Sequence, residues 1–286
     1  MRSGFVAVAG RPNVGKSTLV NALCGTKVAI VSDKPQTTRH RIRGVANGPD
    51  YQLVLVDAPG FQRPRDALTQ RMQQRAEESL ADVDAVLLVL AADQRIGPGD
   101  RFVAARAFAG PAPVVIALNK VDRLRPHEIA AQIERAAALG DFQALHPVSA
   151  RTGDGVGALR EELVALLPEG PLYFPPGEVT DAPLELRIAE LVREKALELT
   201  RDEIPHALTV EVEEIEDRRV AANLYVETSS QKQILIGKGG QMIKTVGMRA
   251  RPEIELLLGG KVFLDLRVKV KPRWRRDERT LERLGL

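Results

Sequence analysis

The chain has 286 residues, a length typical of two domains, and 44% of them are hydrophobic, which is enough for buried cores. Its 41 lysines and arginines nearly balance 38 aspartates and glutamates, so the net charge of +3 identifies no class of partner by itself. The single cysteine, Cys24, excludes an intramolecular disulfide and indicates a reducing cytoplasm, and the longest apolar run, residues 85–92, is far shorter than the roughly 20 residues of a membrane-spanning helix.

The first motif reads G-x-x-x-x-G-K-S and follows a short apolar run, residues 5–9. A helical pattern comes directly after it, so the order strand, glycine loop and helix predicts a phosphate-binding loop. Glycines let several backbone N–H groups converge on one point, and the helix N-terminus adds its positive dipole end. Lys16 is expected to reach the β- and γ-phosphates of a nucleotide, and the Ser17 hydroxyl to bind Mg²⁺. The predicted loop residues are Gly10, Arg11, Pro12, Asn13, Val14, Gly15, Lys16, Ser17 and Thr18.

Residues 32–41 are polar, include a proline and lack apolar periodicity, so they are predicted to form a loop. In a nucleotide switch, such a loop brings a threonine hydroxyl to Mg²⁺ and folds over the γ-phosphate. Thr38 is the preferred candidate for this role, and Thr37 is the alternative.

A second phosphate-side motif follows the apolar run 53–56, which is predicted to be a buried parallel strand. The run ends in D-x-x-G, formed by Asp57, Ala58, Pro59 and Gly60. The aspartate is expected to hold Mg²⁺ through water, and the glycine allows its N–H to approach the γ-phosphate.

The base-side motifs follow further buried strands, predicted at residues 85–90 and 114–118. The second of these strands runs directly into N-K-x-D, whose aspartate accepts from both N1–H and the exocyclic amine of guanine, a donor pair that adenine lacks. Asn119 is expected to tie this motif to the phosphate-binding loop. A last short strand, residues 146–148, delivers a serine and an alanine where a backbone N–H can meet the guanine oxygen. The predicted base site, for GTP or GDP, comprises Asn119, Lys120, Val121, Asp122, Ser149 and Ala150.

Strands that alternate with helices predict an α/β domain over residues 1–168, with a mostly parallel sheet, helices on both faces and the ligand at the carboxyl ends of the strands. Together, the motifs resemble the Ras-like GTPase superfamily. Many members place a water-orienting glutamine after D-x-x-G, but here that position is Phe61, which is typical of a subgroup that hydrolyses GTP slowly or with help. In that subgroup an asparagine of the phosphate-binding loop can hold a potassium ion in place of an arginine finger. Asn13 is therefore either a potassium ligand or a brace of the loop. The residues expected to act on the transferred phosphate are Asn13, Lys16, Thr38 and Gly60.

Residues 169–183 are rich in proline and glycine and are predicted to link the first domain to a second one, residues 184–286. A helical stripe over residues 184–200 is followed by two short strands and then by a G-x-x-G loop between two apolar helical pieces. Pro252 is expected to open a separate helix over residues 252–258. This order resembles an α+β type II KH domain, whose glycine loop clamps about four single-stranded nucleotides. A plain helix–turn–helix is the alternative.

The C-terminal segment alternates apolar and polar residues over residues 261–271, which predicts a final strand. From Lys261 to the end there are nine basic and four acidic residues, so this end is the expected electrostatic footprint for a phosphate backbone, although a solvated charged face is the alternative for residues 277–283. The residues predicted to contact RNA are Ile236, Gly237, Lys238, Gly239, Gly240, Ile243, Lys244, Lys269, Lys271, Arg273, Trp274 and Arg275.

A GTPase domain joined to a type II KH domain resembles the Era family of bacterial GTPases, and residues 34–41 and 268–275 are similar to that family in detail. Ala58 departs from it, because the family usually has threonine there. The resemblance implies a slow GTPase that acts as a monomer in maturation of the 30S ribosomal subunit, binds the 3′ end of 16S rRNA and associates peripherally with the inner face of the cell membrane. An RNA-binding module regulated by guanine nucleotide, with negligible turnover, is the alternative. A tandem-domain or tRNA-modifying GTPase would need a second phosphate-binding loop or a C-terminal cysteine, and the sequence has neither.

Overall fold

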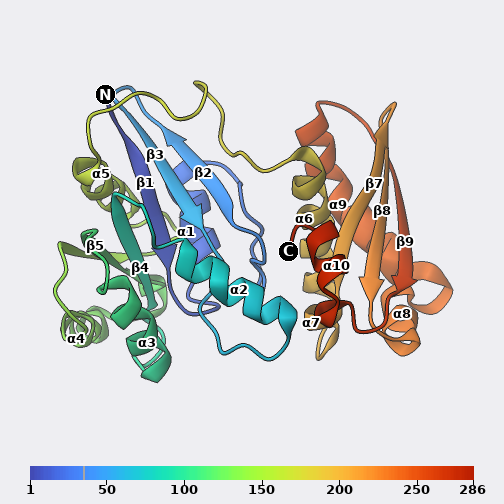
Figure 1. The fold of residues 1–286 in the computed structure, drawn as a ribbon, viewed down its shortest axis with the longest axis horizontal. Coiled ribbons are helices and arrows are strands. Elements are labelled where there is room, and N and C mark those ends of the chain that lie inside the picture. Colours follow the sequence, from blue (N-terminus) through green and yellow to red (C-terminus); the bar gives the residue numbers. More distant parts are fainter. Residues whose placement is uncertain (35) are drawn as a thin grey trace. The chain divides into compact units, whose positions relative to one another are not determined.

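The computed structural model describes residues 1–34 and 36–286 (Figure 1). It contains two compact units, the first holding most of residues 1–181 and the second holding Ala182–Leu286 together with the short segments Ser32–Thr37 and Asp66–Leu68. We describe each unit by itself. Pro35, which belongs to the segment that resembles the Era family, lies outside the described residues.

The first unit is built on a six-stranded sheet with the strand order β2-β3-β1-β4-β5-β6. Neighbouring strands are parallel, except for the antiparallel pair β2 and β3. Five of the strands are confirmed predictions, whereas the sequence pattern does not predict β2, an edge strand that contains Arg43 and Gly44. The strands are β1 (Arg2–Ala9), β2 (Ile42–Asn47), β3 (Tyr51–Asp57), β4 (Ala85–Ala91), β5 (Val114–Asn119) and β6 (Ala144–Val148).

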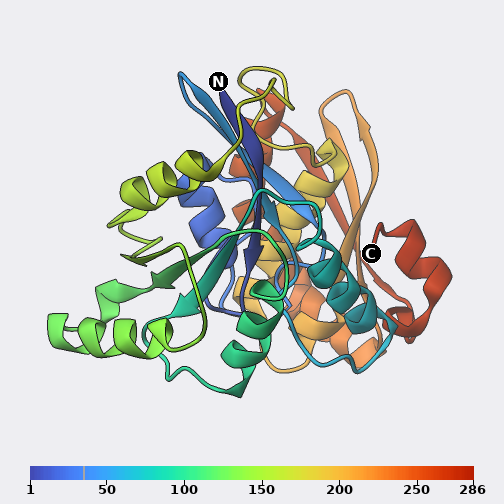
Figure 2. The same ribbon diagram turned by 60° about the vertical axis from the view of Figure 1, so that its left-hand side comes forward.

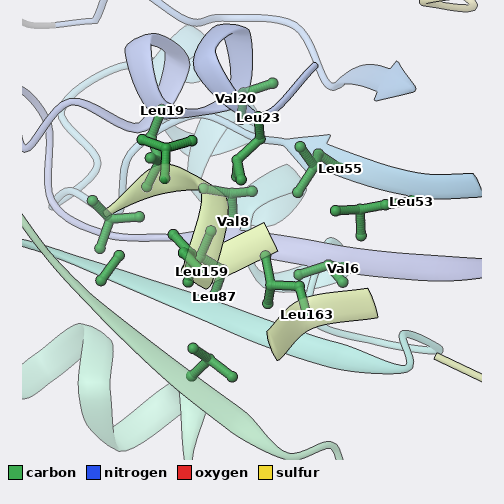
Figure 3. Close-up of a cluster of buried hydrophobic side chains, with 14 of the residues drawn as sticks. Val6, Val8, Leu19, Val20, Leu23, Leu53, Leu55, Leu87, Leu159 and Leu163 are labelled. Carbon is green, nitrogen blue, oxygen red and sulfur yellow. The ribbon is translucent and has the colours of Figure 1, made fainter. Parts of the chain in front are cut away.

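Helices cover both faces of this sheet, because successive strand residues point to opposite sides and both sides are apolar. One face packs against α1 (Lys16–Cys24) and α5 (Val156–Leu166), and Figure 3 shows their leucine side chains directed at those of β1, β3 and β4. The other face packs against α2 (Ala67–Glu78), α3 (Pro98–Ala107) and α4 (Pro126–Ala137). The fold class predicted for this half is confirmed.

The first part of the predicted linker is held against the first unit by one buried glutamine. The Oε1 atom of Gln52 accepts hydrogen bonds from the N–H groups of Tyr173 and Phe174, at 2.9 and 3.0 Å. Its Nε2 atom donates to the Phe174 carbonyl at 3.0 Å and to Oδ1 of Asn47 at 3.0 Å. Because Gln52 is fully buried, these bonds are shielded from water.

The last part of the linker pairs with the edge strand β2. The Val45 N–H donates to the Val179 carbonyl at 2.9 Å, and the Arg43 guanidinium lies 2.9 Å from the Asp181 carboxylate. The linker thus makes its final contacts with the first unit on the strand that directly follows the Thr38 loop.

The second unit has a three-stranded sheet with the order β7-β8-β9, in which β7 and β8 are antiparallel and β8 and β9 are parallel (Figure 2). Its core joins the sheet to α6, α8 and α9. The sequence of main elements, helix–strand–strand–helix–helix–strand, agrees with the predicted type II KH arrangement. The elements are α6 (Leu184–Leu199), α7 (Ile204–Ala207), β7 (Thr209–Glu216), β8 (Arg219–Val226), α8 (Ser229–Ile236), α9 (Gln241–Leu258), β9 (Phe263–Val270) and α10 (Glu278–Arg283). Within the described residues, no helix has the length and apolar character needed to cross a membrane.

The prediction that Pro252 opens a separate helix is wrong, because α9 runs without interruption from Gln241 to Leu258 with Pro252 inside it. A proline in a helix interior removes one hydrogen bond and costs about 3 kcal/mol. The stripe of Val246, Ala250 and Ile254, spaced four residues apart and fully buried, packs the helix onto the core on both sides of the proline. Tertiary packing therefore overrides the local helix-breaking signal.

Candidate functional site

The carboxyl ends of the parallel strands bring the predicted nucleotide motifs to one edge of the first sheet. Gly10 follows β1, Asp57 ends β3, Asn119 ends β5 and Ser149 follows β6. Ligands bind at this edge in open α/β sheets. The motifs, which are far apart in the sequence, are thus gathered at one place in the fold.

Two glycines of the phosphate-side motifs are required by close backbone and side-chain approach. Gly15 has a φ of 98°, and a Cβ atom there would lie 2.3 Å from Nδ2 of Asn119. A Cβ atom at Gly60 would lie 2.8 Å from the Pro12 nitrogen and 3.0 Å from Nζ of Lys16. Any side chain at these two positions would push the loops apart and move the N–H groups that are expected to face phosphate.

Three oxygen-bearing side chains converge where Mg²⁺ is expected. The Ser17 hydroxyl donates to Oδ2 of Asp57 at 2.7 Å and lies 2.9 Å from the Thr38 hydroxyl. The Asp57 side chain is fully buried, and its Oδ1 atom has no hydrogen-bond partner among the described residues. Hydroxyl and carboxylate oxygens, with one buried oxygen left over, fit a hard divalent cation and its water. The Thr37 hydroxyl instead donates to the Lys34 carbonyl at 2.7 Å, so the geometry favours Thr38 over Thr37.

Lys16 and Asp57 form the charged floor of the phosphate side. The Lys16 ammonium donates to the carbonyls of Gly10 and Arg11 at 3.2 and 3.1 Å. Burial lowers the pKa of Lys16 to about 8, and the negative charge of Asp57 opposes this shift. Burial also raises the pKa of Asp57, with Lys16 and the Ser17 hydrogen bond opposing. Bringing phosphate to this ammonium favours its charged form, because an opposite charge nearby stabilises it.

The Asn119 side chain joins the base-side motif to the phosphate-binding loop, as predicted. Its Nδ2 atom donates to the Val14 carbonyl at 3.0 Å, and its Oδ1 atom accepts from the Ala150 N–H at 3.0 Å. Lys120 adds a second link, because its ammonium donates to the Asn13 carbonyl at 2.7 Å. The base-side loops are therefore braced against the phosphate-binding loop by side chains of N-K-x-D itself.

The carboxylate expected to read guanine, Asp122, is held by its neighbours. Its Oδ1 atom accepts from the Ser149 hydroxyl at 2.7 Å. This hydrogen bond is the largest cause that holds the pKa of Asp122 below its usual value, and the nearby Arg151 guanidinium acts in the same direction. The carboxylate is thus ionised at neutral pH. Arg151, which directly follows the serine–alanine pair, is a residue that the motif analysis missed.

Phe61 and its neighbour Gln62 both contact other residues of the first unit in this structure. The Phe61 side chain is buried in the core beneath α2, α3 and α4. The Gln62 amide lies 3.7 Å from Sδ of Met72 on α2. Asn13 is exposed with a φ of 65°, and its role as a potassium ligand stays a prediction.

Cys24 is half-buried and packs against the core beneath α1 and α5. Burial raises the pKa of its thiol to about 12. The thiol is therefore protonated at neutral pH, and we assign it no chemistry.

The G-x-x-G segment of the second unit has the backbone that only glycine adopts readily. Gly237, Gly239 and Gly240 have φ values of 75°, 58° and 78°. A Cβ atom at Gly237 would lie 2.7 Å from that of Met242, whereas the same atom at Gly239 or Gly240 would meet nothing within 4 Å. The loop therefore presents open backbone between the end of α8 and the start of α9.

The side chains next to the G-x-x-G loop have the burial that their predicted roles in RNA binding require. Ile236 and Ile243 are half-buried against the core, which suits an apolar floor, and Lys238 and Lys244 are exposed. Their contact with RNA stays a prediction.

The prediction that Trp274 contacts RNA is wrong for its side chain, which is fully buried. Its indole N–H donates to the Ala207 carbonyl at 2.7 Å, so the ring anchors the C-terminal tail to the core. Arg275 pairs with Glu227 at 2.7 Å and Lys269 with Glu213 at 3.0 Å. Lys271 and Arg273 form no ion pair within the part of the chain that the structure describes, and Arg273 is exposed.

Each of the two units matches a known protein family. Residues 5–120 match the family described as 50S ribosome-binding GTPase, and residues 203–275 match the KH domain family. Over 99% of its length the chain is 50% identical to GTPase Era of Mycobacterium avium, covering 98% of that protein, and 49% identical to GTPase Era of Mycobacterium tuberculosis with the same coverage.

Two crystal structures are similar over the whole chain. An Aquifex aeolicus Era variant bound to GDP·AlF4⁻ is 38% identical, with a TM-score of 0.96 and coverage of 100% of this chain and 99% of that one. A structure of Era in complex with MgGDPNP and nucleotides 1506–1542 of 16S ribosomal RNA is also 38% identical, with a TM-score of 0.94 and the same coverage.

Proposed function

The chain belongs to the Era family of GTPases, and from this premise we propose that it is a guanine-nucleotide switch whose KH unit binds the 3′ end of 16S rRNA and assists maturation of the 30S ribosomal subunit. The observation that carries the proposal is the presence, in one chain, of a complete phosphate and guanine site and an open G-x-x-G loop. We place this activity in the cytoplasm, with peripheral association at the inner face of the membrane. The protein acts as a monomer.

Hydrolysis follows from the geometry of the phosphate side. Lys16 and the Gly60 N–H stabilise the charge that develops on the transferred phosphate. Ser17, Thr38 and, through water, Asp57 would hold Mg²⁺, which would neutralise charge on the phosphate oxygens. Because Phe61 is buried and apolar, no side chain directly after D-x-x-G orients the attacking water, so the intrinsic rate is slow. Asn13 would hold a potassium ion, which would supply positive charge at the transferred phosphate, and equal rates in potassium and sodium buffers would exclude this role.

RNA binding follows from the exposed glycine loop. Without side chains at Gly239 and Gly240, backbone N–H groups can approach phosphates closely, and Lys238 and Lys244 add charge. Ile236 and Ile243 provide the apolar surface on which bases pack. Lys271 and Arg273 extend the basic surface along the chain beyond β9.

The path of the chain supports a link between nucleotide and RNA. The Thr38 loop leads directly into β2, and β2 pairs with residues 179–181, immediately before the second unit begins. A change in the position of Thr38 on GTP binding acts on β2 and therefore on the last anchor of the linker. We propose that the GTP state exposes the RNA-binding groove.

Binding of a short 16S 3′-end RNA tests the proposal. Affinity is compared with a non-hydrolysable GTP analogue and with GDP, at one stated salt concentration because phosphate contacts make it salt-dependent. We expect tighter binding with the analogue and its loss in Gly239→Asp. Gly259→Asp is the matched control, because Gly259 also has a positive φ, 68°, and open space around its Cβ position, but lies at the other end of α9. Equal binding in both nucleotide states would refute the switch, and equal losses in both variants would refute the assignment of the loop.

Burial of Phe61 favours one second candidate, an RNA-binding module that binds GTP with negligible turnover. Measuring multiple-turnover phosphate release with and without the target RNA distinguishes the GTPase switch from this RNA-binding module. Sustained release supports the switch, and a single slow turnover in both cases supports the module.

A further inference from the structure

The guanidinium of Arg151 lies against the carboxylate that is expected to read guanine. Its Nη2 atom is 2.7 Å from Oδ2 of Asp122, whose side chain is 9% exposed, whereas the Arg151 side chain is 72% exposed. The Oδ2 atom itself is closed to solvent, and the approach of Arg151 lacks the alignment of a hydrogen bond. The arginine thus covers one oxygen of a carboxylate whose other oxygen accepts from Ser149.

Guanine needs both oxygens of such a carboxylate, because it offers two neighbouring donors, N1–H and the exocyclic amine at C2. The Ser149 hydroxyl is fully buried and leaves Oδ1 a free lone pair, since a carboxylate oxygen accepts from two directions. Arg151 is different, because its charged guanidinium lies 2.7 Å from Oδ2 on a long side chain that is largely exposed. A base donor that approaches this oxygen has to displace it.

We infer that Arg151 competes with the C2 amine of guanine for Oδ2 of Asp122 and so sets how strongly the protein distinguishes bases by that amine. The inference rests on the assignment of Asp122 to guanine recognition made above. Because the Arg151 side chain is largely exposed to solvent, its pairing with Asp122 changes a binding constant by up to about fivefold. Arg151 is therefore a specificity-tuning residue that neither contacts phosphate nor belongs to N-K-x-D.

The test compares GDP with IDP, whose base lacks the C2 amine, in Arg151→Met. Removing the arginine also weakens the general attraction for phosphate, but this effect is the same for both ligands and cancels in their ratio. We expect the ratio of dissociation constants, IDP over GDP, to rise by about two- to fivefold in the variant. Titration calorimetry with Mg²⁺ at low and high salt measures it, and the difference from the unmodified protein should shrink at high salt.

Arg125→Met is the matched control, because Arg125 is also exposed and lies three residues from Asp122, but no ion pair joins these two residues, both of which the structure describes. A ratio that rises in Arg151→Met alone supports the inference. An unchanged ratio overturns it, and a lower ratio overturns it in favour of a positioning role for Arg151. A ratio of one in the unmodified protein would instead refute the assignment of Asp122 to the amine, which separates failure of the base site from failure of this inference.

Discussion

Thr37 and Thr38 are adjacent in the chain, but their hydroxyls have different partners. The Thr38 hydroxyl lies 2.9 Å from that of Ser17, whereas the Thr37 hydroxyl donates to the Lys34 carbonyl. We expect Thr38→Ala to lower kcat for GTP hydrolysis at least about tenfold, equivalent to about 1.4 kcal/mol of activation free energy, and to raise the Mg²⁺ concentration required. Phosphate release at a series of Mg²⁺ concentrations measures both effects.

Thr37→Ala is the matched control for this prediction. It removes a hydroxyl of the same kind from the same loop, but one that binds only a neighbouring carbonyl. We expect kcat to stay within about twofold of the unmodified value, because a local side-chain to backbone bond contributes little to catalysis. Equal losses in the two variants would show that the loop as a whole, rather than the Thr38 hydroxyl, supports hydrolysis.

For single residues, the sequence predicts those whose function requires a fixed spacing along the chain. It does not predict residues whose position depends on tertiary packing. Ser17, Asp57 and Asn119 are recognisable because phosphate, Mg²⁺ and guanine demand particular groups at the ends of particular strands. Trp274 lies in a basic run and is therefore predicted to contact RNA, but its side chain is buried and its indole N–H donates to the Ala207 carbonyl, which is distant in the sequence. Arg151 carries no motif, and only the position of its guanidinium shows that it contacts Asp122.

Helices and strands also differ in how well the sequence predicts them. Both-face burial makes the residues 53–56 of β3, all of β4 and the residues 114–118 of β5 apolar, so their sequences predict strands. The edge strand β2 pairs with one strand and with the linker, and therefore lacks that pattern. Local signals also mislead at Pro252, because the buried stripe of α9 depends on a core built from residues far away in the sequence.

The buried Gln52 gives an element-scale prediction about the linker. Gln52→Met keeps the length of the side chain but leaves the N–H groups of Tyr173 and Phe174 without this acceptor. We expect the free energy of unfolding of the first unit to fall by about 2–3 kcal/mol, because hydrogen bonds to a buried group are lost together. Urea unfolding measures the loss, and limited proteolysis should show faster cleavage within residues 169–181.

Gln74→Met is the control for the linker prediction, because Gln74 is exposed on α2 and donates a hydrogen bond to Glu78 on the same helix. We expect a change within about 0.5 kcal/mol. A similar small change in Gln52→Met would mean that water replaces the linker at Gln52 without loss, and that the linker is not fastened there.

The whole chain has separate hydrophobic cores in its two units. The sheet of the first unit is packed on both faces by its own helices, and the core of the second unit joins α6, α8 and α9 to β7, β8 and β9. The phosphate-binding loop, Thr38, D-x-x-G and N-K-x-D lie in the first unit, whereas the G-x-x-G loop lies in the second. Sequence motifs predict this division of function, because each motif belongs to a known local arrangement of strand, loop and helix.

Separate cores predict separate responses to ligand. GDP with Mg²⁺ at about a hundred times its dissociation constant stabilises the unit that binds it by about 2.7 kcal/mol, which for a unit of this size raises the melting temperature by about 5–10 °C. We expect differential scanning calorimetry to resolve two transitions, with GDP raising one of them and leaving the other in place. ADP with Mg²⁺ is the control and should shift neither, because adenine lacks the donor pair that Asp122 accepts. A single transition that GDP shifts as a whole would show that the two cores unfold together, and the proposed switch would then act within one cooperative body rather than through the linker.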